Sequence, residues 1–474
     1  MGELETTEQD IITAEVIGET DIDRLIKTEV GRLPHPDGHE HIVDINNHEI
    51  QAQIWRAREI FSKFEDELGE KFDLTSEEGI NEVLRVAKER GIYREAEQIR
   101  NLIYGKNISI YGVSYLSNVC NQNCKYCPMG VVNWENWLVE QQLQIGKDPK
   151  GEDLSDERRQ ELTEKVTNYR KTLRTMSIDE AKEDYQALVE VGHTEICILS
   201  GEEIGANLTK LWDYTQAALD TPGVREVILN MGSYDDHECN AIIAALDIPE
   251  GKKLQFRIFQ ETFNPNEYSY YMENAPLSTD DSKHDMVGRF YAQERAVNAG
   301  FDEVGIGVLF GLSKNPLEEI DGLQRQADLL TYKSGKEPKR CALPFGNEPE
   351  NQHVDIKYRV SKLPRAAEIT ELIYALTRLA MPTVSVVSSE RDEPELLKKL
   401  DKYANHTTLF VHPGPKGNIE SLQELATHSD RKITTVEQAK VTRRFPDVAI
   451  RDWQERGYNI LGFDWQKYVP EAQK

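Results

Sequence analysis

Long apolar runs are what this sequence most clearly lacks. No stretch approaches the roughly 18 to 20 consecutive apolar residues that a helix needs to cross a bilayer. The hydrophobic fraction is 39% and the mean hydropathy is -0.59. We therefore expect a soluble protein with no membrane span and no membrane partner.

Positive charge is also in short supply. Lys and Arg number 56 against 83 Asp and Glu, which gives a formal net charge of -27 and a sequence pI near 4.9. Such a chain repels phosphate backbones, so we expect no nucleic acid partner. The acidic residues are spread over the whole length, which is typical of a solvated surface. Adaptation to high salt and an acidic docking face for a basic partner are the alternatives.

Cysteine is scarce as well. The six cysteines in 474 residues do not form the even, spaced framework of a secreted disulfide scaffold, and no charged-then-apolar signal segment opens the sequence. We expect a reducing, cytoplasmic compartment. A chain of this length buries a large core without disulfides.

The sequence does contain a regular alternation of short β-branched runs and amphipathic helical stretches. Parallel sheets with crossover helices produce this alternation, and eight strands complete a closed barrel. The sequence therefore predicts an α/β fold, a (β/α)8 TIM-type barrel. The eight runs begin at Ile108, Glu195, Arg225, Leu254, Glu303, Arg340, Thr383 and Thr407.

Polar segments extend the barrel at both ends and interrupt it after the first strand. We predict four parts: an N-terminal arm and helical extension at 1–104, a barrel at 105–412, a mostly helical insertion at 131–175 and a C-terminal cap at 413–474. The insertion carries Trp134 and Trp137, which either reshape the mouth of the barrel or belong to an amphipathic helix that caps it.

Two capping boxes mark predicted helix starts. Thr75 with Glu78 precedes a helical stretch of the N-terminal extension, and Ser177 with Glu180 precedes the first barrel helix. In such a box a hydroxyl accepts from the backbone three residues on, and the acidic side chain accepts from the cap residue.

Three cysteines lie within eight residues, in "SYLSNVCNQNCKYCPMG". Cys120, Cys124 and Cys127 have the spacing Cys-x3-Cys-x2-Cys and follow the first strand, at the end of the barrel where catalytic groups gather. A four-iron four-sulfur cluster held by only three thiolates keeps one iron open for an outside ligand. The alternatives are a zinc site completed by a distant histidine and buried, inert cysteines.

With Tyr126 before its last cysteine, this motif resembles the signature of the radical S-adenosylmethionine superfamily. The resemblance implies two cofactors, one 4Fe-4S cluster and S-adenosyl-L-methionine. It also implies that one electron from the cluster cleaves the sulfonium to a 5'-deoxyadenosyl radical, which takes a hydrogen atom from the substrate.

Two further segments look like cofactor-binding turns of this superfamily. In "SGEE", Ser200, Gly201 and Glu202 end the second strand and resemble the turn whose backbone receives the methionyl amino group. In "FQETF", Glu261 ends the fourth strand and resembles a ligand of the ribose or amino group. A simple helix start with acidic residues at its positive end would also explain "SGEE".

The fifth-strand region completes the resemblance. In "ERAVNAGFDEVGIGVLFGLS", Arg295 resembles the arginine that pairs with the cofactor carboxylate, a task suited to a guanidinium fork. Gly305 and Gly307 resemble the glycine-bearing strand that lies against the adenine. Close packing is the alternative explanation of these glycines.

Within the superfamily the sequence looks most like the aromatic amino acid lyase group, which includes 2-iminoacetate synthase and the tyrosine lyase of iron–iron hydrogenase maturation. Three departures bear on substrate. After the seventh strand the lyases read Ser-Thr-Arg-Glu, and this sequence has Ser388, Ser389, Glu390 and Arg391. No cysteine follows Cys341, which excludes the second cluster of the hydrogenase enzyme. The lyases' arginine pair after the sixth strand is replaced here by Phe345, Gly346 and Asn347. Tyrosine is therefore a doubtful substrate, and candidate substrate contacts are Asn347, Ser388 and Arg391.

These features predict a radical enzyme, of EC 4.1.99 lyase type, that cleaves or rearranges a carbon–carbon bond of a small amino acid-like substrate in cofactor biosynthesis. A mutase or a hydrogenase-type maturation enzyme is the near alternative, and a non-catalytic iron–sulfur electron-transfer or scaffold protein is the distant one. We expect three kinds of partner: the small-molecule substrate, a one-electron donor of ferredoxin or flavodoxin type, and a maturation or biosynthetic protein.

Overall fold

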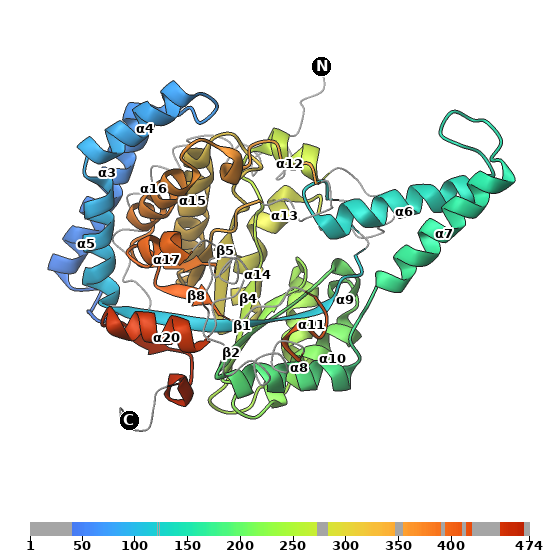
Figure 1. Cartoon of the computed structure of the whole chain (residues 1–474). Helices are drawn as coiled ribbons and strands as arrows, with labels where there is room; N and C mark the ends of the chain where they lie inside the picture. Colours follow the sequence, from blue (N-terminus) through green and yellow to red (C-terminus); the bar gives the residue numbers. More distant parts are fainter. Residues whose placement is uncertain are drawn as a thin grey trace, which may run out of the picture.

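The computed structural model describes residues 40–120, 122, 124–272, 283–346, 354–389, 394–409, 414–419 and 446–468. Its centre is a closed barrel of parallel strands surrounded by helices (Figure 1). β1 pairs with β2 on one side and with β8 on the other, which closes the sheet. The predicted (β/α)8 barrel is therefore confirmed. Its strands are β1 (Asn107–Ser117), β2 (Glu195–Ser200), β3 (Glu226–Asn230), β4 (Lys253–Arg257), β5 (Glu303–Gly307), β6 (Arg340–Ala342), β7 (Ser385–Ser388) and β8 (His406–Thr408).

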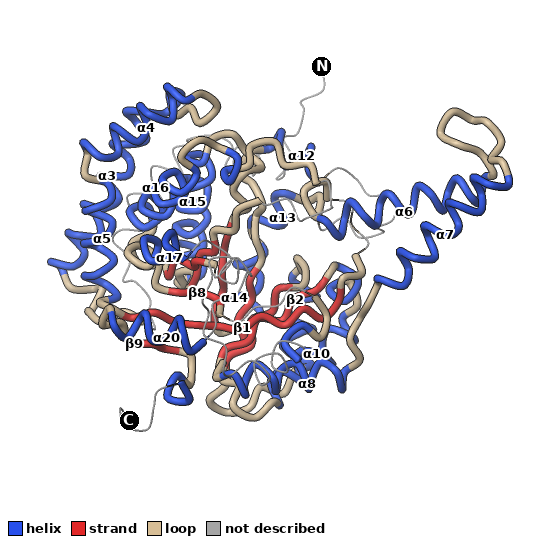
Figure 2. The backbone as a smooth tube through the Cα atoms, in the orientation of Figure 1, coloured by secondary structure: helices blue, strands red, loops and turns tan. Residues whose placement is uncertain are grey.

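Alternation of side chains sorts each strand into an inner and an outer face. Cys197 of β2 joins the small cluster inside the barrel, whereas Ile196 and Ile198 pack outward against the helices. The helices that follow the strands cover the outside (Figure 2). They are α8 (Ile178–Val191), α10 (Leu208–Asp220), α11 (Asp236–Ala245), α14 (Ala292–Ala299), α15 (Pro316–Ser334), α16 (Ala366–Ala380) and α17 (Pro394–Leu400), with shorter pieces α9 (Glu202–Gly205), α12 (Pro265–Tyr271), α13 (Met286–Phe290) and η2 (Val360–Lys362).

Ion pairs fill the lower end of the barrel, where the strands begin. The guanidinium of Arg340 is buried and lies 2.5 Å from Glu195 and 2.9 Å from Glu226. Lys339 pairs with Glu226 at 2.8 Å. Buried charges of this kind are tolerated only when they are paired. The network therefore forms a buried polar layer at the end of the barrel where the strands begin.

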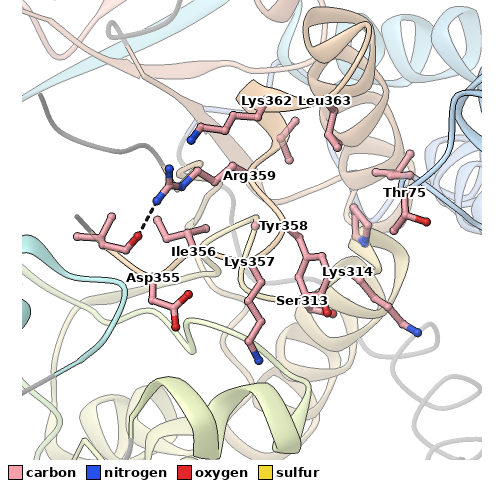
Figure 3. Close-up of a pocket in the computed structure, with 15 residues that line it drawn as sticks. Thr75, Ser313, Lys314, Asp355, Ile356, Lys357, Tyr358, Arg359, Lys362 and Leu363 are labelled. Atoms are coloured by element: carbon pink, nitrogen blue, oxygen red, sulfur yellow. Dashed lines mark hydrogen bonds between the residues drawn. The ribbon is translucent and has the colours of Figure 1, made fainter. Parts of the chain in front are cut away.

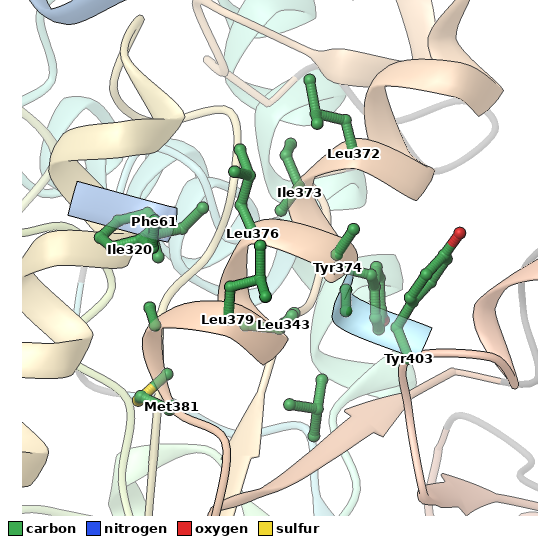
Figure 4. Close-up of a cluster of buried hydrophobic side chains, with 14 of the residues drawn as sticks. Phe61, Ile320, Leu343, Leu372, Ile373, Tyr374, Leu376, Leu379, Met381 and Tyr403 are labelled. Atoms are coloured by element: carbon green, nitrogen blue, oxygen red, sulfur yellow. The ribbon is translucent and has the colours of Figure 1, made fainter. Parts of the chain in front are cut away.

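The N-terminal extension packs against α16. Its helices are α3 (His48–Leu68), η1 (Gly69–Lys71), α4 (Glu77–Glu89) and α5 (Ile92–Tyr104). Figure 4 shows the shared core, where Phe61 of α3 lies among side chains of α15 and α16. The predicted capping box at Thr75 is wrong by one residue. The cap is Ser76, which accepts from Gly79 N–H, because Thr75 is held by Asp73 instead.

Two helices follow the cysteine loop, α6 (Pro128–Ile145) and α7 (Asp156–Thr172). They pack on each other through Val139, Leu162 and Val166, and they extend away from the barrel (Figure 1). The side chains of Trp134 and Trp137 lie outside the described residues. The helices thus form an arm that begins directly after Cys127, not a cap over the barrel.

The C-terminal segment returns to the start of β1. It contains α20 (Pro446–Glu455), β9 (Asn459–Leu461) and η3 (Trp465–Tyr468), and β9 runs parallel to β1 from Asn107. Buried Trp453 anchors α20 by donating to Asp401 at 3.0 Å. No helix within the described ranges combines the length and apolar character of a membrane span.

Candidate active site

The three cysteines lie where β1 leaves the barrel at its upper end. Cys124 is buried, Cys120 and Cys127 are half-buried, and none of the six cysteines forms a disulfide. Burial raises the pKa of Cys124 to about 12, and burial with nearby Glu202 and the neighbouring thiols raises that of Cys120. Thiolates gathered here need a compensating positive centre, which iron supplies. This donor set therefore fits the cluster that the sequence implies.

The described residues offer no set of three His, Cys, Asp or Glu side chains arranged to hold a single metal ion. The zinc alternative, which needs a histidine beside the cysteines, gains no support from the geometry.

The "SGEE" turn packs directly against the cysteine loop. A Cβ on Gly201 would lie 2.0 Å from the Val119 carbonyl and 3.0 Å from Cys120 Cβ, so only glycine fits. Gly201 N–H donates to Ser117 at 3.1 Å, and Ser200 Oγ donates to the Gly201 carbonyl at 2.7 Å. The backbone N–H of Glu202 donates to the Cys120 thiol. The second-strand turn is thus part of the cysteine site.

Glu261 follows β4 and points into the same region. Its carboxylate lies 2.7 Å from Lys283 Nζ and 3.3 Å from Arg289 Nη2, and all three side chains are buried. Burial would raise the pKa of Glu261, but attraction to the two cations and a hydrogen bond from Tyr126 hold it below its ordinary value. Tyr126 stacks edge-on against Tyr271. The group is a buried cluster of one anion and two cations beside the cysteines.

Arg289, which the sequence did not single out, lies beside Glu261, whereas Arg295 contacts another segment. Arg289 Nε donates to the Phe259 carbonyl at 2.5 Å, and its buried Nη1 has no hydrogen-bond partner among the described residues. Arg295 lies one helix further on, where its Nε donates to the Tyr234 carbonyl at 2.7 Å and Nη2 approaches Ser233 Oγ at 3.4 Å. This placement does not support the prediction that Arg295 binds the cofactor carboxylate, because the Arg295 guanidinium contacts the turn after β3 instead.

The glycines of β5 make room for side chains of β4. A Cβ on Gly305 would lie 3.0 Å from Arg257 Nε, and a Cβ on Gly307 would lie 2.6 Å from the Phe259 ring and from the Ala342 carbonyl. Close packing inside the barrel therefore accounts for both glycines. The structure gives no separate sign of the adenine contact predicted for them.

Of the three predicted substrate contacts, the structure describes only Ser388. Ser388 shares the outward face of β7 with Val386, and its Oγ lies 3.5 Å from the His406 carbonyl, so it does not face the barrel interior. Asn347 and Arg391 lie outside the described residues. Phe345, which replaces one of the lyase arginines, stacks between Phe310 and Tyr374, with ring centroids 5.3 and 6.2 Å away.

A cavity of about 480 Å³ lies beside this site (Figure 3). It is lined by the turn before α15 and by residues 354–363, and by none of the three cysteines. Two of its cations have partners of their own: Lys357 pairs with Glu267 at 2.8 Å, and Arg359 donates to the Val354 carbonyl at 2.6 Å. The same segment supports the cysteine loop, because Asp355 N–H donates to the Lys125 carbonyl at 3.0 Å.

Sequence reasoning missed Lys283 and Arg289. Lys283 stands in the polar stretch "STDDSKHD", where nothing distinguishes it from a surface lysine. Arg289 and Arg295 are six residues apart in one helical stretch, and both are followed by apolar residues. A break between α13 and α14 at Tyr291 turns the two arginines to different places. Residues 289–295 contain no proline or glycine, so the sequence gives no signal of this break.

Comparisons with known proteins show which proteins this chain is similar to. No protein-family model matches the chain. The chain is 22% identical over 391 residues to the 2-iminoacetate synthase of Escherichia coli (strain K12), across 80% of this chain and 84% of that protein. Two solved structures share its fold. The FeFe-hydrogenase maturase HydG from Carboxydothermus hydrogenoformans has a TM-score of 0.60 and 21% identity, covering 94% of this chain and 84% of that one. Methylornithine synthase (PylB) has a TM-score of 0.53 and 16% identity, covering 86% and 100%.

The resemblance predicted from the cysteine motif is therefore confirmed: the chain resembles radical S-adenosylmethionine enzymes, the tyrosine lyase group among them.

Proposed function

We propose that this chain is a radical S-adenosylmethionine enzyme that cleaves or rearranges a carbon–carbon bond of a small amino acid-like substrate in cofactor biosynthesis. The observation that carries the proposal is the meeting of three cysteines with the Glu202 turn and the Glu261, Lys283 and Arg289 group at the upper end of the barrel. Its similarity to 2-iminoacetate synthase favours a lyase of EC 4.1.99 type.

Each part of the site has a task in this proposal. Cys120, Cys124 and Cys127 hold the cluster, which, when bound, supplies the electron that converts S-adenosylmethionine into methionine and a 5'-deoxyadenosyl radical. Arg289 offers a buried guanidinium nitrogen to a carboxylate. Glu261 accepts from an amino or hydroxyl group while Lys283 balances its charge.

The walls around this group are apolar. Tyr126 contacts a cluster formed by Tyr268, Tyr271 and Met272 from α12 and the residue after it. Such walls exclude water from the reacting atoms and strengthen the electrostatic contacts inside. They suit a site that must protect a carbon radical from side reactions.

The substrate differs from tyrosine in how it is held. At the position of the lyase arginine pair, Phe345 is packed between two other rings and presents no charge. A carboxylate without its bidentate partner loses about 1.5 to 3 kcal/mol of binding. We infer a small amino acid-like substrate whose carboxylate is bound elsewhere in the barrel mouth.

The partner and compartment follow from the chemistry. A one-electron donor of ferredoxin or flavodoxin type would reduce the cluster, in a cytoplasm that keeps cysteines reduced.

Anaerobic reconstitution tests the function. The proposal requires about four irons per chain and reductive formation of 5'-deoxyadenosine, as for a cluster with one open iron. Product analysis with a panel of amino acids then identifies the substrate. A chain that binds zinc, or that binds iron but forms no 5'-deoxyadenosine from S-adenosylmethionine, would refute it. Formation of p-cresol from tyrosine would show that the argument from Phe345 is wrong.

A further inference from the structure

A buried carboxylate without a cation supports the turn that carries Glu261. Glu319 lies on α15 and is 1% exposed. It accepts from Phe263 N–H at 2.8 Å and from Thr262 Oγ1, the two residues that follow Glu261. The described ion pairs include none to Glu319. Burying a polar carboxyl group costs free energy unless it is hydrogen-bonded, and Glu319 makes both of these hydrogen bonds to one turn.

One helical turn further along α15, Gly322 completes a socket for the same segment. A Cβ on Gly322 would lie 2.2 Å from the Phe263 ring. Glycine in the middle of a helix lowers stability relative to alanine, and this one has no turn to make. Its position i+3 from Glu319 places both on one face of α15. Glu319 accepts hydrogen bonds from the Thr262–Phe263 segment, and Gly322 leaves space for the Phe263 ring. We call these two residues the socket.

The residue that this segment holds has an unusual backbone. Glu261 has φ of 72°, a left-handed conformation that is rare for residues other than glycine and aspartate or asparagine. Strain of this kind persists only where the surroundings enforce it. On the other side, Leu309 N–H donates to the Glu261 carbonyl at 2.8 Å. Glu261 is therefore fixed between β5 and the socket on α15.

We propose that Glu319 and Gly322 are positioning residues that hold Glu261 in its left-handed conformation, so that its carboxylate meets Lys283, Arg289 and the bound S-adenosylmethionine. This inference rests on the proposed function for the identity of the ligand, but the geometry of the turn can be tested without it. Neither residue touches the cysteines or the Glu261 carboxylate, so both act through the backbone of the turn.

The test compares Glu319→Ala, Gly322→Ala, Phe263→Ala and the double variant Gly322→Ala/Phe263→Ala in the reconstituted, full-length chain. Asp321→Asn is the matched control, because Asp321 stands on the same helix and pairs with Arg325 at 2.7 Å, away from the turn. Two quantities are measured: the affinity for S-adenosylmethionine, and hydrogen exchange of the backbone at residues 258–264 relative to the rest of the barrel.

Glu319→Ala, which removes both hydrogen bonds to the turn, and Gly322→Ala should each weaken S-adenosylmethionine binding about 10- to 100-fold and speed exchange in the turn, because small displacements of a positioning group are felt strongly. Removing the Phe263 ring should return the Gly322→Ala affinity to within about threefold of the Phe263→Ala single variant, as expected for two residues in contact. The control should change neither quantity.

Unchanged affinity and exchange in both socket variants would overturn the proposal. Faster exchange with unchanged affinity would reduce the socket to a structural role and would also overturn it. If the unmodified chain does not bind S-adenosylmethionine, the proposed function fails, and the exchange data still decide whether the socket holds the turn.

Discussion

Lys283 Nζ lies 2.7 Å from Glu261 Oε1, and both side chains are about nine-tenths buried. This pair joins the segment before α13 to the segment that follows β4, next to the cysteine loop. Removing one member of a buried pair leaves the other charge uncompensated, which costs roughly 3 to 5 kcal/mol. We therefore expect Lys283→Met to lower the free energy of unfolding by several kcal/mol and to abolish 5'-deoxyadenosine formation.

Lys283→Arg is the informative companion variant. It keeps the charge but changes the shape of the donor, so it should retain most of the stability while lowering the rate of 5'-deoxyadenosine formation. Thermal unfolding and product assays on the same preparations check both effects. Equal stability of Lys283→Met and the unmodified chain would contradict the pairing.

Arg289 and Arg295 can be separated by substitution. Arg289→Gln should weaken S-adenosylmethionine binding by about 10- to 100-fold, because a charged hydrogen bond contributes about 1.5 to 3 kcal/mol. Arg295→Gln should leave that affinity within about threefold, because its side chain holds Tyr234 instead, although the unfolding temperature should fall. Equilibrium dialysis with the labelled cofactor measures both. The reverse ranking would restore the sequence-based prediction.

The cysteines divide into two sets of three. Replacing Cys120, Cys124 or Cys127 with alanine should reduce bound iron from about four per chain to less than one, because a cluster with three protein ligands has none to spare. Cys197, Cys239 and Cys341 are buried within the core, so their replacement with alanine should leave iron content unchanged. Iron and sulfide assays with electron paramagnetic resonance distinguish the outcomes. Loss of iron in the second set without loss of fold would contradict the assignment.

Glu319 should make stability depend on pH. Burial raises its pKa to about 8 from an ordinary 4.5, with hydrogen bonds from Thr262 and Phe263 opposing the rise. The folded chain therefore holds a proton that the unfolded chain releases above 4.5. This contribution to stability is complete below about pH 4.5 and declines as pH rises to about 8, by an amount on the order of a few kcal/mol.

Glu319→Gln removes this titration. Relative to the unmodified chain, the unfolding temperature of the variant should therefore improve between pH 6 and pH 8.5. Differential scanning calorimetry at several pH values checks this, with Asp321→Asn as the control. A constant difference across that range would show that Glu319 is ionised throughout.

The strands and the cysteine loop could be read from the sequence because their signals are local. Runs such as "EICILS" are rich in β-branched residues and short enough to be strands, and each of the eight predicted runs overlaps a strand. The cysteine spacing is likewise confined to one loop. Ser177 forms its predicted capping box with Glu180 for the same reason.

The composition of the Glu261 group could not be read in this way because it depends on contacts between distant segments. Lys283 and Arg289 reach Glu261 across 22 and 28 residues. Glu319 reaches the same turn across 57. Only the packing of α13 and α15 against the end of β4 brings these charges together. The predicted role of Arg295 stays a prediction, and the structure places its side chain against Tyr234 and Ser233, because a motif gives the spacing of residues but not the direction of a helix.

The ion-pair network around Arg340 fills the end of the barrel at which the strands begin. Its ion pairs tie the first residues of β2, β3 and β6 to one another. In the proposed function, substrate would therefore enter and product would leave at the opposite rim, beside the residues that hold the cofactors.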